Sequence, residues 1–291
     1  MGMKVTPALL ACLATAVVFT AAGVAAPPAE PPTGPVAEAE PDDVAASDTA
    51  ASDPAAPDAV EPAEPELARA EPMAVDSEPE PRRVYERSSD LPDGGPFPER
   101  GNGTWHVVPG TFAEAGSGSA LSYTVEVEDG VQVDEHAFAG FVQQTLADPR
   151  GWISAGFALR RVDSGVPDFR VRLTSQATAR ERCGFQIPVD VSCRDGGAVD
   201  LSAARWARGA VAYLGDLDGY RRYVVNHEVG HALGQGHVPC AEHGAPAPVM
   251  MQQTFSTSND EINLITAGSA QGGVVPNDGK VCAPNPWPFP G

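Results

Sequence analysis

Alternation of apolar and polar residues from residue 122 onward predicts a β-sheet. In a strand every second side chain points to the same face, so these segments can bury their apolar positions against a core. We expect strands at residues 122–127, 157–162, 169–173 and 198–201.

Apolar residues at helical spacing predict two helices. The first follows Asp134, and the second covers residues 218–233 with Asp216 and Asp218 near its start, because short acidic side chains cap helix N-termini. The apolar stripes are Phe138, Phe141, Val142 and Leu146 in the first helix and Val225, Val229, Ala232 and Leu233 in the second. This order of elements predicts an α+β domain in which helices pack on a twisted sheet.

Composition separates this domain from the start of the chain. Lys4 precedes an apolar run over residues 8–26, which is typical of an export signal, and residues 23–25 offer a cleavage site. The run is also nearly long enough to remain in a bilayer as an anchor. We expect a signal peptide or signal anchor over residues 1–26.

The segment after the apolar run lacks core-forming residues. Residues 27–81 consist mostly of Ala, Pro, Glu and Asp, with fifteen acidic residues against one basic residue, Arg69, so they carry most of the net charge of −20. Chains of this composition repel themselves and bury no core. We expect a disordered acidic spacer over residues 27–96 and one domain over residues 97–291, which folds when the chain starts near Phe97.

Charge also bears on the partners of the protein. Because the acidity lies in the spacer, it says little about what the domain binds, and the chain has no basic stripe or nucleic-acid motif. We expect a secreted or extracellular monomer that binds no nucleic acid. Contact with a membrane is expected only through the N-terminal segment.

A run of three histidines and one glutamate carries the candidate chemistry. Residues 227–237 read His-Glu-x-x-His-x-x-Gly-x-x-His. On a helix His227 and His231 share one face, and Gly234 can turn the chain back so that His237 supplies a third ligand. Three protein ligands leave one position open, which is typical of catalytic zinc, and Glu228 is placed to act as general base. We expect one catalytic Zn²⁺ on this motif.

The motif resembles that of the metzincin metalloproteases. Residues 220–226 before it and residues 247–254 after it are similar to the secreted actinobacterial domains of unknown function called DUF3152, and this likeness covers roughly residues 97–291. The metzincin resemblance implies a zincin fold with a twisted mixed sheet, an active-site helix and a methionine turn. Met250 matches the turn methionine better than Met251 does.

In two respects the chain departs from the metzincin pattern. No tyrosine of the kind that stabilises an oxyanion in some metzincins follows Met250 closely, and residues 255–281 look like an insertion. The group that polarises a scissile carbonyl beside the metal is therefore left open.

Four cysteines follow Cys12, which lies in the apolar run of the signal segment. In an exported protein they tend to oxidise, and four cysteines allow three pairings. We expect Cys183 to pair with Cys193 and Cys240 with Cys282. The alternative is that Cys240 ligates zinc. It is not needed, because three histidines and water already complete a catalytic site.

Together these features predict a secreted or envelope-tethered zinc metallopeptidase. It would hydrolyse peptide bonds in a peptide or protein substrate through a zinc-activated water, with Glu228 as general base. Two alternatives stay open: a noncatalytic zinc-stabilised cell-surface interaction protein and a cell-wall peptide hydrolase.

Overall fold

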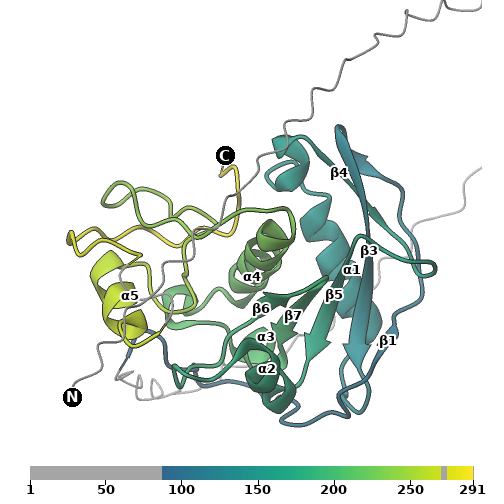
Figure 1. The fold of residues 1–291 in the computed structure, drawn as a ribbon, viewed down its shortest axis with the longest axis horizontal. Helices are drawn as coiled ribbons and strands as arrows, with labels where there is room; N and C mark the ends of the chain where they lie inside the picture. The colour runs from purple at the N-terminus through teal and green to yellow at the C-terminus, as the bar shows by residue number, and fades with distance from the viewer. Residues whose placement is uncertain (1–86, 270–273, 291) are drawn as a thin grey trace, which may run out of the picture. The chain divides into compact units, whose positions relative to one another are not determined.

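The computed structural model describes residues 87–269 and 274–290 (Figure 1). The expected signal segment 1–26 and the spacer up to residue 86 lie outside these described residues. No helix in the described ranges is long and apolar enough to cross a membrane.

One mixed sheet forms the framework of the domain. In the described part of the chain its strands lie in the order β2-β4-β3-β5-β7-β6, and β1 pairs with the end of β3. The strands β4, β3, β5 and β7 run parallel, whereas β1, β2 and β6 are antiparallel to their neighbours. Their bounds are β1 Trp105–Val107, β2 Ala115–Gly116, β3 Ser119–Glu128, β4 Phe157–Arg161, β5 Phe169–Thr174, β6 Cys193–Asp195 and β7 Ala198–Ser202. The four expected strands correspond to β3, β4, β5 and β7.

The expected helices are α1 and α4. The Asp134 carboxylate accepts from the Ala137 amide at 2.9 Å, and the Asp216 carboxylate accepts from the Gly219 amide at 2.8 Å, so Asp216 rather than Asp218 caps α4. The helices are α1 Glu135–Leu146, α2 Gln176–Cys183, α3 Ala203–Arg208, α4 Leu217–Ala232 and α5 Asn259–Thr266, with 3-10 turns η1 Trp152–Ala155 and η2 Val211–Tyr213. The sequence pattern did not predict α2, α3 and α5.

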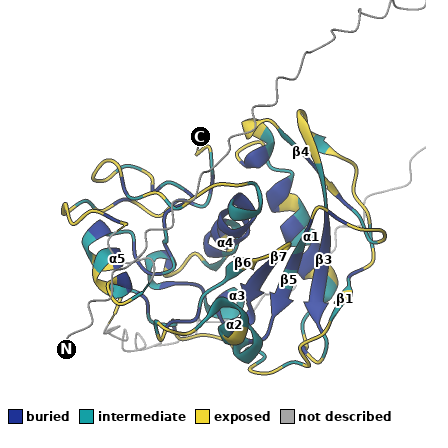
Figure 2. Cartoon of the chain, in the orientation of Figure 1, coloured by how far each residue is buried: buried dark blue, intermediate teal, exposed yellow. Residues whose placement is uncertain are grey.

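The main core lies between one face of the sheet and the helices α1 and α4, which pack against each other (Figure 1). The sheet contributes Val125, Val127, Val171, Leu173, Val199 and Leu201 to this core. Figure 2 shows the parallel strands β3, β5 and β7 buried along most of their length, as expected for parallel strands inside a domain. The amphipathic patterns of strand and helix therefore specify this interface.

The opposite face of the sheet is polar and also buried. Arg172 pairs with Glu126 of the neighbouring strand at 2.8 Å, and Arg182 of α2 pairs with the fully buried Asp200 at 2.7 Å. Glu128 accepts from the Ser175 amide at 2.6 Å. Because a buried charge is tolerated only when it is paired, α2 can cover this face without an apolar stripe of its own.

Residues 255–281, which resemble an insertion in the sequence, include α5 and help to form a second apolar cluster. This cluster contains Met251, Phe255 and Ile262 together with both cysteines of the Cys240–Cys282 disulfide bond. The described parts of this segment, residues 255–269 and 274–281, therefore belong to the packed domain.

Residues 87–96 contact the domain, although the sequence pattern assigned them to the spacer. Arg205 is fully buried on α3, and its guanidinium donates to the carbonyls of Ser89 at 2.6 Å and Asp90 at 3.0 Å. Pro92 is buried as well. These contacts extend the packed chain upstream of Phe97.

We predict that a chain starting at residue 97 is less stable than one starting at residue 87. It lacks two carbonyl partners of a buried cation, and hydrogen bonds to charged groups contribute about 1.5–3 kcal/mol each. The expected loss is about 3 kcal/mol, or a melting temperature lower by roughly 8 °C for a domain of this size. Differential scanning calorimetry of the two chains checks this, and equal melting would contradict it.

Candidate metal centre

The helix α4 and the turn after it bring three imidazoles together. His227 and His231 lie one helical turn apart with ring centroids separated by 4.9 Å. Gly234 has φ of 86°, a conformation that reverses the chain at the helix end and that side chains rarely tolerate. His237 then returns, and its ring centroid lies 5.2 Å from that of His227 and 4.6 Å from that of His231. One nitrogen from each histidine lies within 4.8 Å of the others, an arrangement able to hold a metal ion.

Backbone carbonyls orient two of these rings. Nδ1 of His227 lies 2.8 Å from the Val249 carbonyl, and Nδ1 of His231 lies 2.8 Å from the Gln235 carbonyl. Because a carbonyl only accepts, both Nδ1 atoms donate, and each Nε2 keeps a free lone pair. Nε2 of His231 lies 3.0 Å from Nε2 of His237. Such outer hydrogen bonds are the usual way in which ligand histidines are held in place.

Burial keeps the three imidazoles neutral. It lowers the pKa of His227 well below its ordinary value, with further lowering by His237 and His231. Burial also lowers the pKa of His231, and it lowers the pKa of His237 to about 4, with a contribution from the charge of His231. Neutral imidazole is the form that binds metal, so the site is ready for a cation at neutral pH.

Glu228 is a buried carboxyl group beside the histidines. Burial, followed by the charge of Asp200, raises the pKa of Glu228 to about 8. Its Oε2 atom is buried and has no hydrogen-bond partner among the residues that the structure describes. The carboxyl also lines the same cleft as the three histidines. It can therefore hold or release a proton near neutral pH at a place that a ligand can reach.

The turn that carries Met250 packs directly under α4. The Met251 amide donates to the Pro248 carbonyl at 2.9 Å, which closes the turn. A Cβ atom on Gly230 would collide with the sulfur of Met250 and with the ring of Trp152. Glycine at this helix position thus permits the close approach that also brings the Val249 carbonyl to His227.

A polar network anchors the turn to α4 and to the C-terminal tail. The Tyr223 hydroxyl donates to the Met251 carbonyl at 2.9 Å and accepts from the Gln253 amide at 2.8 Å. The buried Gln253 side chain accepts from the Tyr213 hydroxyl at 2.8 Å and donates to the Asn285 carbonyl at 2.9 Å. Sequence reasoning missed Gln253, because a glutamine with no spaced partner carries no signal of a buried position.

The structure forms the two expected disulfide bonds, Cys183–Cys193 and Cys240–Cys282. Cys240 is therefore committed to a disulfide and does not supply a metal-binding thiolate. Two disulfide bonds indicate an extracellular or otherwise oxidising environment.

The histidines open onto a cleft of about 770 Å³. Its walls come from the loop after α2, from β6 and from the segment after Met250. Beside the histidines and Glu228, the lining includes Gln186, Ile187, Val189, Arg194, Tyr223, Gln252, Thr254, Phe255 and Gly268.

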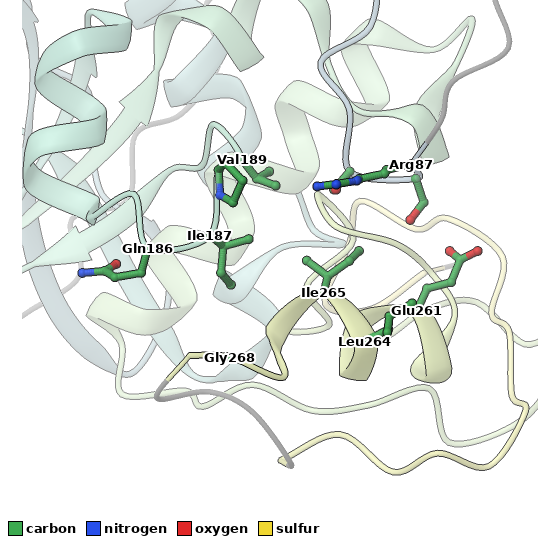
Figure 3. Close-up of a pocket in the computed structure, with 11 residues that line it drawn as sticks. Arg87, Gln186, Ile187, Val189, Glu261, Leu264, Ile265 and Gly268 are labelled. Carbon is green, nitrogen blue, oxygen red and sulfur yellow. The ribbon is translucent and has the colours of Figure 1, made fainter.

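A second cavity of about 510 Å³ adjoins the cleft and shares Gln186, Ile187, Val189 and Gly268 with it. In Figure 3 the apolar side chains of Ile187 and Ile265 face each other across this cavity, and Arg87 and Glu261 lie at its edge. The cleft of the candidate metal centre therefore adjoins a second hollow along the loop after α2.

We predict that Gly230→Ala destabilises the domain even though alanine favours helix by about 1 kcal/mol. The new methyl group must displace Met250 and Trp152, and overpacking of a core costs about 1–3 kcal/mol. Urea unfolding measures the difference. Gly140→Ala in α1 is the control, because its Cβ meets nothing within 4 Å and should leave stability equal or higher. Equal effects of the two substitutions would contradict the close approach.

A second prediction concerns pH and the metal-free protein. When folding raises the pKa of a carboxyl group, the free energy of unfolding is highest at pH values below the pKa of the unfolded state. This stability is lost as the pH rises through the pKa of the folded state. For Glu228 the loss occurs between pH 4.5 and about 8. Glu228→Gln removes this loss. At about 1.4 kcal/mol per pKa unit the full shift corresponds to about 5 kcal/mol, and because the group is half titrated at each end, the stability of the variant relative to the parent should rise by roughly 4 kcal/mol from pH 4.5 to 8.

Urea unfolding in the presence of chelator, at several pH values, checks this prediction. Asp218→Asn is the matched control, since Asp218 lies exposed near the start of α4. A constant difference in stability between Glu228→Gln and the parent would count against a raised pKa of Glu228.

Comparison with known proteins places the chain in a family. No curated protein matches it. A family model described as "Protein of unknown function (DUF3152)" matches residues 91–290, which is more than half of the 291 residues. This match confirms the resemblance of the flanking segments to that family and covers every residue of the metal centre. The chain belongs to the DUF3152 family.

Proposed function

We propose that this protein is a secreted or envelope-tethered zinc-dependent endopeptidase. The observation that carries the proposal is the convergence of three neutral imidazoles beside the buried carboxyl group of Glu228, all on one open cleft. Its Oε2 atom has no hydrogen-bond partner among the described residues. Structural zinc sites usually close their shell with four protein ligands, whereas three histidines leave a position open.

The donor set fits zinc. Imidazole nitrogen suits Zn²⁺, and the four cysteines of the described residues are held in disulfides, so no thiolate competes for the ion. His227, His231 and His237 would hold the metal, with two of the rings fixed by backbone carbonyls. Zinc in such a site polarises a carbonyl group and lowers the pKa of water.

Glu228 supplies the proton transfer. Its carboxylate accepts a proton from the attacking water and returns it to the leaving amine. A pKa of about 8, raised by burial and then by Asp200, makes the group a good proton acceptor and still a usable donor near neutral pH. Metal binding adds a positive charge next to the carboxylate and shifts its pKa downward. Glu228 thus acts as a general base and then as a general acid, and no covalent intermediate with the enzyme forms.

Several features support the metzincin-like fold as the finer description of the domain. The metal helix α4 ends at a glycine turn, and the third histidine follows. Met250 occupies a turn directly beneath that helix, and its sulfur lies where a Cβ atom on residue 230 would stand. The cleft is bordered by the antiparallel edge strand β6 of a mixed sheet.

The proposal competes with a noncatalytic, metal-stabilised surface protein. A cleft of about 770 Å³ open to the histidines favours an enzyme, since a purely stabilising metal needs no such access. A cell-wall peptide hydrolase would use the same residues on a different peptide, so the choice of substrate distinguishes it.

We predict that Glu228→Gln separates catalysis from metal binding. The variant keeps the side-chain shape and all three imidazoles, so it should bind about one zinc per chain while peptide hydrolysis falls by about 10²-fold or more. His231→Ala is the contrasting variant, because it removes a ligand and should lose metal together with activity. Metal content by mass spectrometry and cleavage of a diverse peptide library measure both properties.

Three outcomes are informative. Parental turnover by Glu228→Gln would refute the role of Glu228. A fully zinc-loaded parent that cleaves no peptide would favour the noncatalytic protein. Cleavage confined to cell-wall peptides would assign the same chemistry to a wall hydrolase.

A further inference from the structure

Among the described residues that line the cleft, Arg194 is the only lysine or arginine. It lies on the edge strand β6, opposite Val199 of β7. The other charged group of the lining, apart from the histidines, is Glu228. A fixed positive charge therefore stands in the wall of the candidate active site.

Strand geometry sets the direction of Arg194. Successive side chains in a strand point to opposite faces. Cys193 and Asp195 point toward α2, because Cys193 forms a disulfide with Cys183 and Asp195 pairs with Arg182 at 3.0 Å. Arg194 must then point to the other face of the sheet, where Val199 packs in the core with α4.

The lining of the cleft agrees with this direction, because Arg194 lines the same cleft as the three histidines and Glu228. Within residues 87–269 and 274–290 no carboxylate pairs with Arg194, and the side chain is exposed. Its neighbours on α2, Arg180 and Arg182, are both paired with aspartates.

We propose that Arg194 is a specificity-determining residue that binds an acidic side chain of the substrate. This inference rests on the proposed peptidase function and adds a substrate class to it: peptides with Glu or Asp close to the scissile bond. A guanidinium binds carboxylate through charge-assisted, often bidentate hydrogen bonds. The backbone of Arg194 is held by the ladder with β7 and by the adjacent disulfide, so binding needs to order only the side chain.

The test uses the full-length protein and sets of peptides that differ only in Glu, Gln or Lys at one position near the cleavage site. The parent should cleave the best Glu peptide about tenfold faster in kcat/KM than its Gln counterpart, which corresponds to one charge-assisted hydrogen bond. Arg194→Gln should remove the preference, and Arg194→Glu should reverse it in favour of Lys. Arg160→Glu is the control, because it changes the charge by the same amount at an exposed position. Arg160 lies on β4, near the edge of the sheet opposite to β6.

A binding experiment gives a readout without turnover. Fluorescence anisotropy of labelled peptides on zinc-loaded Glu228→Gln should show about tenfold tighter binding of Glu than of Gln peptides, and adding Arg194→Gln should abolish this difference. The preference should persist in peptides with an amidated C-terminus. Its loss on amidation would assign Arg194 to a terminal carboxylate instead of a side chain.

The outcomes separate the two proposals. Cleavage without any preference for acidic residues, or an unchanged preference in Arg194→Glu, overturns the role of Arg194 alone. A parent that cleaves no peptide overturns the peptidase function, and the binding comparison then decides whether Arg194 recognises acidic peptides.

Discussion

The close approach of α4 to the turn at Pro248–Met251 is the constraint on which the candidate metal centre depends. Gly230 has no side chain, so Met250 can lie against the helix. The same approach brings the Val249 carbonyl to Nδ1 of His227 and thereby fixes the ring. The Val238 amide, next to His237, donates to the Met250 carbonyl at 3.2 Å, so the same turn also contacts the segment that returns the third imidazole.

Much of the support for this approach is polar and comes from distant parts of the chain. Tyr223 and Gln253 tie the turn to α4, and Asn285 adds the C-terminal tail. The guanidinium of Arg205 on α3 likewise donates to the carbonyls of residues 89 and 90 and thereby binds this upstream segment to the domain. Each of these buried groups is tolerable because its hydrogen bonds are formed within the fold.

The sequence predicted the elements whose signals are local. Strand alternation, the caps at Asp134 and Asp216, and the glycine at the end of α4 all depend on near neighbours, and the structure contains them. The histidine spacing likewise predicted which three rings meet. Other features depend on partners far along the chain: α2 covers a polar sheet face, Arg205 is fully buried, and residues 87–96 pack on the domain. A hydropathy pattern assigns such residues to the surface, because it cannot show the carboxylate or carbonyl that satisfies them.

The two disulfide bonds have a consequence for when the cleft becomes functional. Cys183 and Cys193 both line the cleft, and Cys240–Cys282 lies in the cluster behind Phe255, which lines it as well. A chain newly made in a reducing compartment has neither cross-link, so two walls of its cleft are less constrained than in the oxidised protein. Oxidation completes both walls together. The cysteines thus couple the shape of the cleft to the redox state of its compartment, and under the proposed function this coupling restrains hydrolysis until both cross-links have formed.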